Sequence, residues 1–227
     1  DNIPLNILLK KNKKIWADIR GIISLATETE ESTNDFLIPT VFLNMPQQEY
    51  GLNIDVNDYL GGKLAIEHLY KNNWKNPAFI THHDLSGDVK ERYDGVKMAC
   101  NDFNIDCKLI TTNSFSMEES YHVTKNALSD KSIDSIFYFC DQMAIGGIKA
   151  IDELGYKMGE DIGIIGFDNL EISEFLGLSS IDQKLYEKML YSVEYILFGN
   201  GQLFTEKSSK IIYNPEVAAR KSSIKIA

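Results

Sequence analysis

The sequence contains few cysteines, a deficit of basic side chains and no long apolar run. Its three cysteines are an odd number without the paired spacing of metal sites, which indicates free thiols in a reducing cytosol. Acidic residues number 33 against 23 basic ones, so the formal net charge is −10. Because an acidic surface repels phosphate, we expect no direct contact between this stretch of chain and nucleic acid.

Membrane and export signals are also absent from the sequence. No apolar stretch approaches the roughly 20 residues that cross a bilayer, and residues 1–6 lack the basic and apolar segments of a signal peptide. The mature form of an exported protein would lack that signal as well. With 44% hydrophobic and 25% charged residues, the composition predicts a soluble globular protein without a membrane partner.

Short apolar segments rich in β-branched and aromatic residues alternate along the chain with longer amphipathic segments. The segments expected as strands are 21–26, 39–44, 52–56, 78–81, 108–111, 135–139, 162–167 and 210–213. The segments expected as helices begin after Asn57, near Val89, after Ser116, after Asp141 and at Leu185. This alternation predicts an α/β fold with parallel sheets covered by helices on both faces.

Several helix ends carry recognisable signals. Asn57 predicts an N-terminal cap, and Ser116 with Glu119 predicts a capping box in which each side chain binds the other's backbone N–H. Gly155 predicts the end of the helix after Asp141, and residues 199–201 (Gly-Asn-Gly) predict the end of the last helix.

Polar residues stand where the predicted strands end, and parallel sheets bind ligands beyond the carboxyl ends of their strands. Asn44 and Asp168 each end or follow a strand, and Arg92 lies near the start of a helix. Planar amide, carboxylate and guanidinium groups can bind two neighbouring hydroxyls of a sugar. Phe115 offers a face for the apolar side of a sugar ring. Three further candidates follow the strand at 135–139, namely Cys140, Asp141 and Gln142.

Each candidate also has a simpler interpretation. Asp141 precedes a helix, so we expect it to be a helix cap at the pocket, and Arg92 can be a surface or salt-bridged arginine. Cys140 and Phe115 can be core residues, and Asp168 can cap a turn. The order and context of these residues, rather than any one of them, favours a binding site.

Patterns of catalysis are missing. Gly146 and Gly147 lie inside a predicted helix rather than before one, so they form no phosphate-binding loop. His82 and His83 are adjacent on an extended segment, where side chains point to opposite sides and make an awkward metal pair. No serine or cysteine has an identifiable base partner. We therefore expect no enzymatic activity, no cofactor and no metal.

Several motifs occur in an order that is similar to that of the LacI/GalR family of bacterial transcriptional regulators. These motifs are Asn57–Leu69 (NDYLGGKLAIEHL), Glu91–Gly95 (ERYDG), Cys140–Gly146 (CDQMAIG), Gly159–Asn169 (GEDIGIIGFDN), Leu178–Gln183 (LSSIDQ) and Pro215–Ser223 (PEVAARKSS). These six motifs occur in order between residues 57 and 223, which makes the resemblance specific.

The resemblance implies a fold of two doubly wound parallel-sheet subdomains joined by three crossovers, of the type I periplasmic-binding-protein-like kind. Residues 1–56 with 185–211 would form one subdomain, and 57–184 with 212–227 the other. It implies a cytoplasmic homodimer that senses a sugar or sugar derivative in the cleft between subdomains. Operator DNA would be bound by an N-terminal domain that this sequence does not contain. Effector contacts carried over by position are Arg92, Asp168, Asn44, Phe115, Cys140 and Gln142.

The sequence also departs from the family pattern. Cys140 replaces the usual asparagine, which removes a hydrogen-bonding amide, and Gly159 replaces the usual proline. Nothing in residues 1–18 resembles the opening strand and helix of the family core, so we expect the first part of the N-terminal subdomain to be missing. A soluble sugar-binding protein of a transport system shares the fold and is the alternative.

Overall fold

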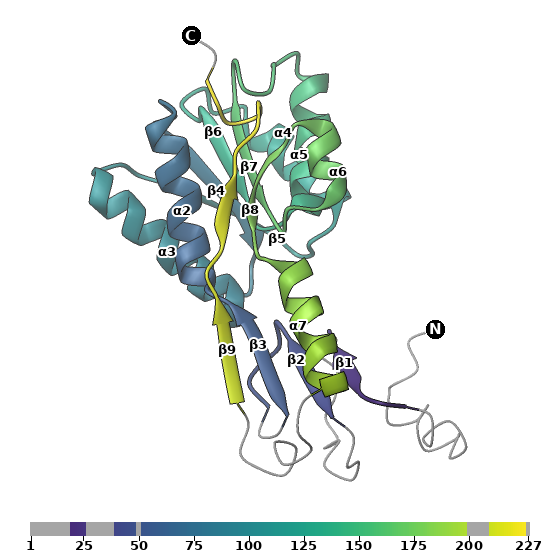
Figure 1. Ribbon diagram of the computed structural model, residues 1–227. Helices are drawn as coiled ribbons and strands as arrows, with labels where there is room; N and C mark the ends of the chain where they lie inside the picture. Colours follow the sequence, from purple (N-terminus) through teal and green to yellow (C-terminus); the bar gives the residue numbers. More distant parts are fainter. Residues whose placement is uncertain (1–18, 26–38, 49–50, 199–208, 226–227) are drawn as a thin grey trace. The chain divides into compact units, whose positions relative to one another are not determined.

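The computed structural model describes residues 19–25, 39–48, 51–198 and 209–225 (Figure 1). Contacts divide the chain into two units. Unit 1 contains Asp1–Val56 and Leu185–Tyr213, and unit 2 contains Asn57–Lys184 and Asn214–Ala227. The expectations for residues 1–18, for Ala26 and for the helix stop at 199–201 lie outside the described residues.

The described residues of unit 1 form a four-stranded sheet of parallel strands and a helix. Its strands are β1 (Ile22–Ser24), β2 (Thr40–Leu43), β3 (Leu52–Val56) and β9 (Ser209–Tyr213), hydrogen-bonded in the order β1-β2-β3-β9. Helix α7 (Leu185–Phe198) packs on this sheet through Met189, Tyr195 and Ile196. Strand β9 begins one residue before the expected start at Lys210 and ends at Tyr213, as expected.

Unit 2 contains a six-stranded sheet in the order β10-β8-β7-β6-β4-β5. Its strands are β4 (Pro77–His82), β5 (Lys108–Thr112), β6 (Ser135–Tyr138), β7 (Gly163–Phe167), β8 (Ser179–Asp182) and β10 (Glu216–Ala218). Strands β4 to β8 are parallel, and β10 alone pairs antiparallel, with β8. The carboxyl ends of β4 to β8 therefore meet at one edge of the sheet.

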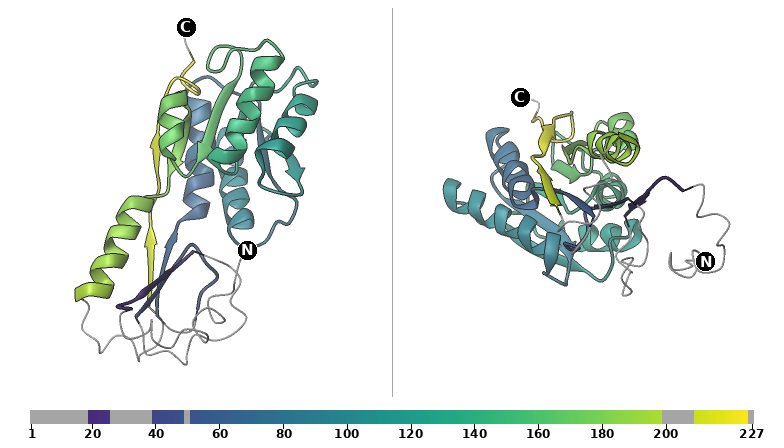
Figure 2. Two further views of the ribbon diagram at one scale, coloured as in Figure 1. Left: turned by 90° about the vertical axis from the view of Figure 1, so that its right-hand side faces the viewer. Right: turned by 60° about the horizontal axis from the view of Figure 1, so that its bottom comes forward.

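Helices cover both faces of the unit 2 sheet. Helices α2 (Asp58–Lys71) and α3 (Gly87–Phe103) lie on one face, and α4 (Met117–Ala127) and α5 (Asp141–Glu153) lie on the other (Figures 1 and 2). The short helix α6 (Glu171–Leu176) precedes β8. This arrangement confirms the predicted α/β class with parallel sheets. No helix in the described part of the chain is long and apolar enough to cross a membrane.

Two glycines allow α2 and α3 to approach each other closely. A Cβ on Gly62 would lie 2.0 Å from the backbone oxygen of Arg92, and one on Gly95 would lie 1.9 Å from that of Tyr59. Both distances are far below van der Waals contact. The glycine-containing motifs at 57–69 and 91–95 thus form the two sides of one helix contact, and this contact positions Arg92.

Most predicted elements are confirmed within one or two residues, and β3 and α7 match their expected bounds. The Asn57 side chain accepts the Leu60 N–H at 3.0 Å, as expected for a cap. The capping box is only half correct. Ser116 accepts the Glu119 N–H, but the Glu119 carboxylate accepts N–H groups of Asn113 and Ser114 instead. These two bonds lower the pKa of Glu119.

The sequence interpretation missed α6, β8 and β10. The segment after Tyr213 contains β10 and the fully buried Ser222 and Ser223. The Ser222 hydroxyl donates to the Ile164 oxygen at 2.7 Å and accepts the Ser179 N–H at 2.7 Å. Hydrogen bonds between distant segments, which local patterns do not reveal, bury these serines.

Candidate functional site

Arg92 lies in the first half of α3 and is buried, with 4% of its surface exposed. Its Nε donates to Asp58 Oδ1 at 3.0 Å, its Nη2 donates to the same oxygen, and its Nη1 donates to the Phe139 carbonyl. These bonds use three of the five N–H donors of a guanidinium. Arg92 is therefore held inside the fold, which excludes the simple surface interpretation.

Two aromatic rings enclose the Arg92 guanidinium. Its Cζ lies 4.0 Å from the centroid of the Phe139 ring and 3.3 Å from that of Phe167. Phe139 follows β6 and Phe167 ends β7, so both rings stand at the carboxyl edge of the sheet. Stacking on both faces fixes the plane of the guanidinium and leaves its edge for hydrogen bonds.

Asp58 is the charged partner of Arg92. It is the first residue of α2 and is 8% exposed. Burial raises the pKa of Asp58, and the charge and hydrogen bonds of Arg92 oppose that rise. A carboxylate in this position compensates the buried positive charge, which would otherwise be costly to desolvate.

Phe115 extends the aromatic surface at this edge. It is 40% exposed, and its ring centroid lies 4.8 Å from that of Phe139 and 5.1 Å from that of His82. Phe115 is thus neither a core residue nor isolated. It forms a partly exposed platform that continues the stack around Arg92.

Asp168 directly follows β7 and has an unusual backbone conformation. Its φ is 108° and that of Asn169 is 55°, both in a region that side chains seldom adopt. Gln183 Nε2 donates to Asp168 Oδ1 at 2.7 Å. Arg220 Nη2 donates to Asn169 Oδ1, also at 2.7 Å, and so supports this turn from the C-terminal segment. Such conformations persist where surrounding contacts hold them, often at binding sites.

Asp141 is not the helix cap that we predicted. The N-cap of α5 is Cys140, and Asp141 is the first helical residue and fully buried. Its carboxylate accepts hydrogen bonds from the Leu170 N–H (2.9 Å) and from the hydroxyls of Ser173 (2.6 Å) and Ser180 (2.7 Å). Asp141 thus joins α5 to the segment of α6 and β8. Its role in this structure is internal.

Cys140 and Gln142 flank Asp141. Cys140 is half-buried, and burial raises the pKa of its thiol to about 11, so the thiol stays protonated at neutral pH. The negative charge of Asp168 also raises this pKa, and the positive charge of Arg92 lowers it. Gln142 is exposed in the first turn of α5.

Asn44 belongs to unit 1, where it directly follows β2. It is exposed, with a φ of 51°, and its Oδ1 accepts a hydrogen bond from Lys188 Nζ at 2.8 Å. Lys188 comes from α7 and is fully buried. The end of β2 therefore carries an exposed amide next to a buried ammonium group.

The expectation that the side chains of His82 and His83 point to opposite sides is wrong. Strand β4 ends at His82, so the alternation of side chains does not continue to His83, and the two ring centroids lie 4.3 Å apart. His82 Nε2 bonds the Asn113 oxygen, and His82 Nδ1 accepts the Asp84 N–H. Within the described ranges, no group of three or more metal-binding side chains gathers here or elsewhere.

The structure brings Arg92, Asp168, Phe115 and Cys140 to one edge of unit 2. The sequence interpretation did not assign Asp58, Phe139, Phe167 or Gln183 to this edge, nor Lys188 to the end of β2. Phe139 and Phe167 end predicted strands, so their positions were a usable signal. Asp58 and Lys188 gave none, because their partners are far away in the sequence.

Comparisons with known proteins agree with this architecture. A model of the periplasmic binding protein-like domain matches residues 66–189. The HTH-type transcriptional repressor PurR of Mannheimia succiniciproducens is 29% identical over 98% of this chain and 68% of its own length. PurR of Actinobacillus pleuropneumoniae serotype 3 is 31% identical over 96% of this chain and 66% of its own length. The chain thus spans about two thirds of the length of these repressors.

Solved structures share the fold. A LacI family transcriptional regulator from Enterococcus faecium with bound ribose has a TM-score of 0.79 at 22% identity, over 100% of this chain and 87% of that one. A dimeric Lac repressor has a TM-score of 0.77 at 20% identity, over 100% of this chain and 86% of that one.

The parallel sheet of unit 2 has candidate binding residues at its carboxyl edge, and the family model matches most of this unit. The class of protein is therefore that of the periplasmic binding protein-like domains. The chain belongs to this family, among the LacI-type transcriptional regulators, which confirms the resemblance seen in the motifs. These relatives are regulators rather than enzymes, and they favour a regulator over the alternative of a transport protein.

Proposed function

We propose that this chain is the effector-sensing and dimerising part of a cytoplasmic LacI-type repressor, and that its effector is a small hydroxylated molecule such as a sugar or sugar derivative. Effector binding would change the operator affinity of a DNA-binding domain outside this sequence. The net charge of −10 supports a separate DNA-binding domain, because an acidic surface on this part of the protein repels phosphate.

The observation that carries the proposal is the fixed guanidinium of Arg92. Three of its N–H groups donate hydrogen bonds to Asp58 and to the Phe139 carbonyl. The other two N–H groups form no hydrogen bond with a described residue. Because stacking between Phe139 and Phe167 fixes the plane, these two donors have a defined direction. A preorganised pair of donors binds adjacent hydroxyls without the entropy cost of ordering a flexible side chain.

Nearby groups complete a site for such a ligand. Asp168 offers carboxylate oxygens as acceptors, and Phe115 offers a partly exposed aromatic face. We propose Cys140, Gln142 and Asn44 as further contacts of the ligand. The ribose in the Enterococcus faecium regulator is a chemical precedent for this class of ligand.

A thermal-shift screen tests the proposal. The panel contains ribose, other pentoses, hexoses, disaccharides and sugar phosphates, with flat heterocycles as a separate arm because Phe115 can stack on either kind of ring. A ligand that binds the native state raises the unfolding midpoint by mass action. Arg92→Lys should abolish the shift, since it keeps a charge beside Asp58 but loses the planar donor pair.

Lys90→Ala is the matched control, because Lys90 lies two residues away on the exposed side of α3. It should keep the full shift. If Arg92→Lys responds as strongly as the wild type, Arg92 does not bind the effector.

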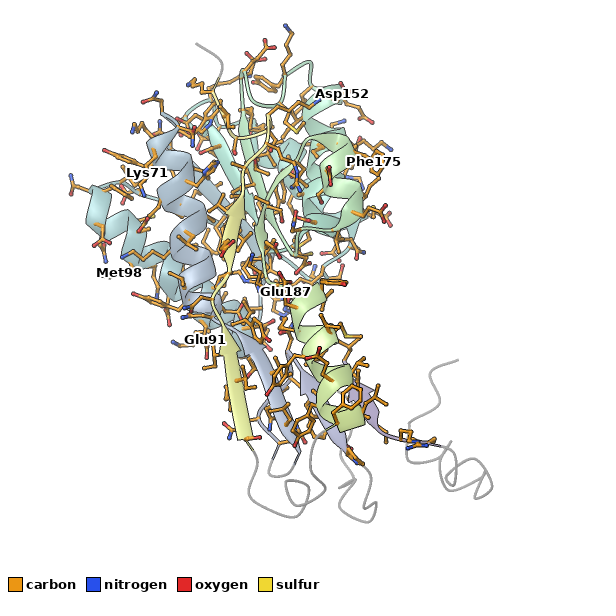
Figure 3. All side chains as sticks on the ribbon, viewed as in Figure 1. Lys71, Glu91, Met98, Asp152, Phe175 and Glu187 are labelled. Atoms are coloured by element: carbon orange, nitrogen blue, oxygen red, sulfur yellow. The ribbon has the colours of Figure 1, made fainter. Side chains whose placement is uncertain are left out.

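We also propose that α6 contributes to a homodimer surface. Phe175 is 80% exposed and Ile172 46% exposed on this helix. Exposed apolar groups of this size commonly mark subunit contacts. Phe175→Ser should shift the mass measured by light scattering from dimer to monomer. Met98→Ser, 40% exposed on the other side of unit 2 (Figure 3), should not. A Phe175→Ser protein that stays dimeric would remove α6 from the interface.

A further inference from the structure

Thr81 has a buried hydroxyl that forms no hydrogen bond within the described fold. Thr81 is the next-to-last residue of β4, and 0% of its surface is exposed. Among the described residues, its Oγ1 has no hydrogen-bond partner. The other buried side-chain atom of this kind in these ranges is Asp55 Oδ1, and the second oxygen of that carboxylate pairs with Lys210 at 2.8 Å. Because Thr81 has no second polar atom in its side chain, no described residue replaces the hydrogen bonds to water that it loses on folding.

Other buried threonine hydroxyls of unit 2 do have partners. Thr112 Oγ1 donates to the Thr81 oxygen at 3.2 Å and to the Ser114 oxygen at 2.7 Å. Thr124 Oγ1 lies 3.0 Å from the Tyr138 hydroxyl, and both residues are fully buried. A buried polar group without a partner is costly and calls for an explanation, and one explanation is a partner that comes from outside the chain.

The Thr81 side chain lies on the face of the sheet that α3 covers. Side chains two residues apart on a strand point to the same face, so Thr81 shares the face of Phe79. The Phe79 ring stacks on Tyr93 of α3, with centroids 6.1 Å apart, and on Phe137 of β6, with centroids 4.8 Å apart. The Thr81 hydroxyl is therefore on the side of the sheet that carries Arg92.

Thr81 also lies at the carboxyl edge of the sheet, beside a ring that contacts Arg92. Strands β4 and β6 are parallel with Ile80 opposite Tyr138, and the Phe139 N–H donates to the Ile80 oxygen at 2.9 Å. Phe139 is thus the neighbour of Thr81 across this strand pair. The Phe139 ring centroid lies 4.0 Å from Arg92 Cζ, and the Phe139 carbonyl accepts from Arg92 Nη1. Thr81 and Arg92 are therefore both neighbours of Phe139, and each has hydrogen-bonding capacity that no described residue uses.

We propose that Thr81 is a specificity-determining contact of the effector, and that its hydroxyl binds a ligand hydroxyl that Arg92 also binds. This inference rests on the proposed function and narrows its ligand class. A guanidinium only donates, whereas a threonine hydroxyl donates and accepts. The ligand hydroxyl accepts from Arg92 and donates to Thr81 Oγ1. A site built around such a hydroxyl rejects the analogue that lacks it, because buried groups of the protein are then left without a partner. The protein should therefore discriminate between a sugar and one of its deoxy analogues.

The stability of the protein without effector provides the first test. Thr81→Val removes the hydroxyl and nearly keeps the shape of the side chain. It should not lower the unfolding midpoint in urea, because no hydrogen bond within the described fold is lost. Thr124→Val is the matched control, and it should lower the midpoint because it breaks the contact with Tyr138. If Thr81→Val lowers the midpoint as much as Thr124→Val, the Thr81 hydroxyl has a partner within the fold and the inference is wrong.

Titration calorimetry with the sugar found in the thermal-shift screen provides the second test. Thr81→Val should raise the dissociation constant about threefold to tenfold, the usual worth of one hydrogen bond. Thr81→Ser keeps the hydroxyl and should bind like the wild type, as should Thr124→Val. The sugar is then compared with each of its deoxy analogues. The wild type should bind one of them much more weakly than the sugar, and Thr81→Val should show a smaller difference for that analogue.

The outcomes separate this inference from the proposed function. If Arg92→Lys loses binding while Thr81→Val binds the sugar and its deoxy analogues like the wild type, Thr81 does not contact the effector. The proposed function would then stand without this inference. If the wild type binds no hydroxylated compound of the panel, both are wrong.

Discussion

Asp141 and Asp168 occupy the same kind of position in the sequence, each shortly after a buried strand, yet their environments differ completely. Asp141 is fully buried and accepts hydrogen bonds from Leu170, Ser173 and Ser180. Asp168 is only half-buried, and one of its oxygens accepts from Gln183. The first carboxylate stabilises the fold, and the second is the one that we propose as an effector contact.

The difference arises from neighbours that are distant in the sequence. Gly166 leaves space for Asp141, since a Cβ at Gly166 would lie 2.1 Å from Asp141 Oδ1. Asp168 instead lies in a turn with two consecutive positive φ angles, and it is half-buried. A shared local pattern thus produces a structural residue in one case and a functional candidate in the other.

We expect the largest loss of stability when the Asp141 carboxylate is removed. Asp141→Ala removes the acceptor of two buried hydroxyls, those of Ser173 and Ser180, and of the part-buried Leu170 N–H. A buried donor left without an acceptor costs about 1–3 kcal/mol. We expect the free energy of unfolding to fall by about 3 kcal/mol or more in urea titrations. Asp152→Ala, an exposed acid on the same helix (Figure 3), should change it by less than about 0.5 kcal/mol. Equal losses in the two variants would contradict the assignment of Asp141.

A second variant tests whether the close contact between α2 and α3 positions Arg92. Gly62→Ala places a methyl group against the Arg92 backbone oxygen, 2.0 Å from its position now. Overpacking of this kind costs about 1–3 kcal/mol, and it should also displace Arg92 and weaken effector binding. Lys71→Ala on the same helix is exposed and should do neither. Unchanged unfolding and binding in Gly62→Ala would show that the α2–α3 contact does not position Arg92.

We expect a smaller effect from His68, which contacts the C-terminal segment and makes the free energy of unfolding depend on pH. His68 Nε2 lies 2.6 Å from the Ser223 hydroxyl, and burial lowers the pKa of His68 below its ordinary value of 6.5. The unfolded state therefore binds a proton more readily, so His68 contributes stability above pH 6.5 that is lost as the pH falls toward its folded pKa. Wild-type stability should decrease relative to His68→Gln as the pH falls from 7 to about 5. Parallel pH curves for the two proteins would exclude this linkage.

The parts of the fold that local patterns determine were predictable from the sequence. Helix α7 and strand β3 have clear periodicity, and Asn57 is a cap whose partner lies three residues away. Strand β8 was missed because its serines look like loop residues. Ser179 and Ser180 are fully buried only because Arg220, Ser222 and Asp141 bond with them.

The residues of the candidate site were likewise only partly predictable from the sequence. Arg92 and Asp168 were found because they occur in motifs that resemble a known family. Asp58 was not found, because its significance depends on a contact with a residue 34 positions away. The error about Asp141 has the same origin, since its donors come from a segment that follows it by about 30 residues. Pairings over such distances are set by the tertiary fold and cannot be read from local sequence.

The central claim is that the carboxyl edge of unit 2 binds the effector through Arg92 and Asp168. The most direct measurement compares the wild type with Asp168→Asn by titration calorimetry, using the ligand found in the thermal-shift screen. Asparagine tolerates the positive φ and can still accept from Gln183, so the free energy of unfolding should change by less than about 0.5 kcal/mol. The dissociation constant should rise about tenfold to a hundredfold, because a charged acceptor is lost. An unchanged dissociation constant in a stable Asp168→Asn protein would contradict the claim.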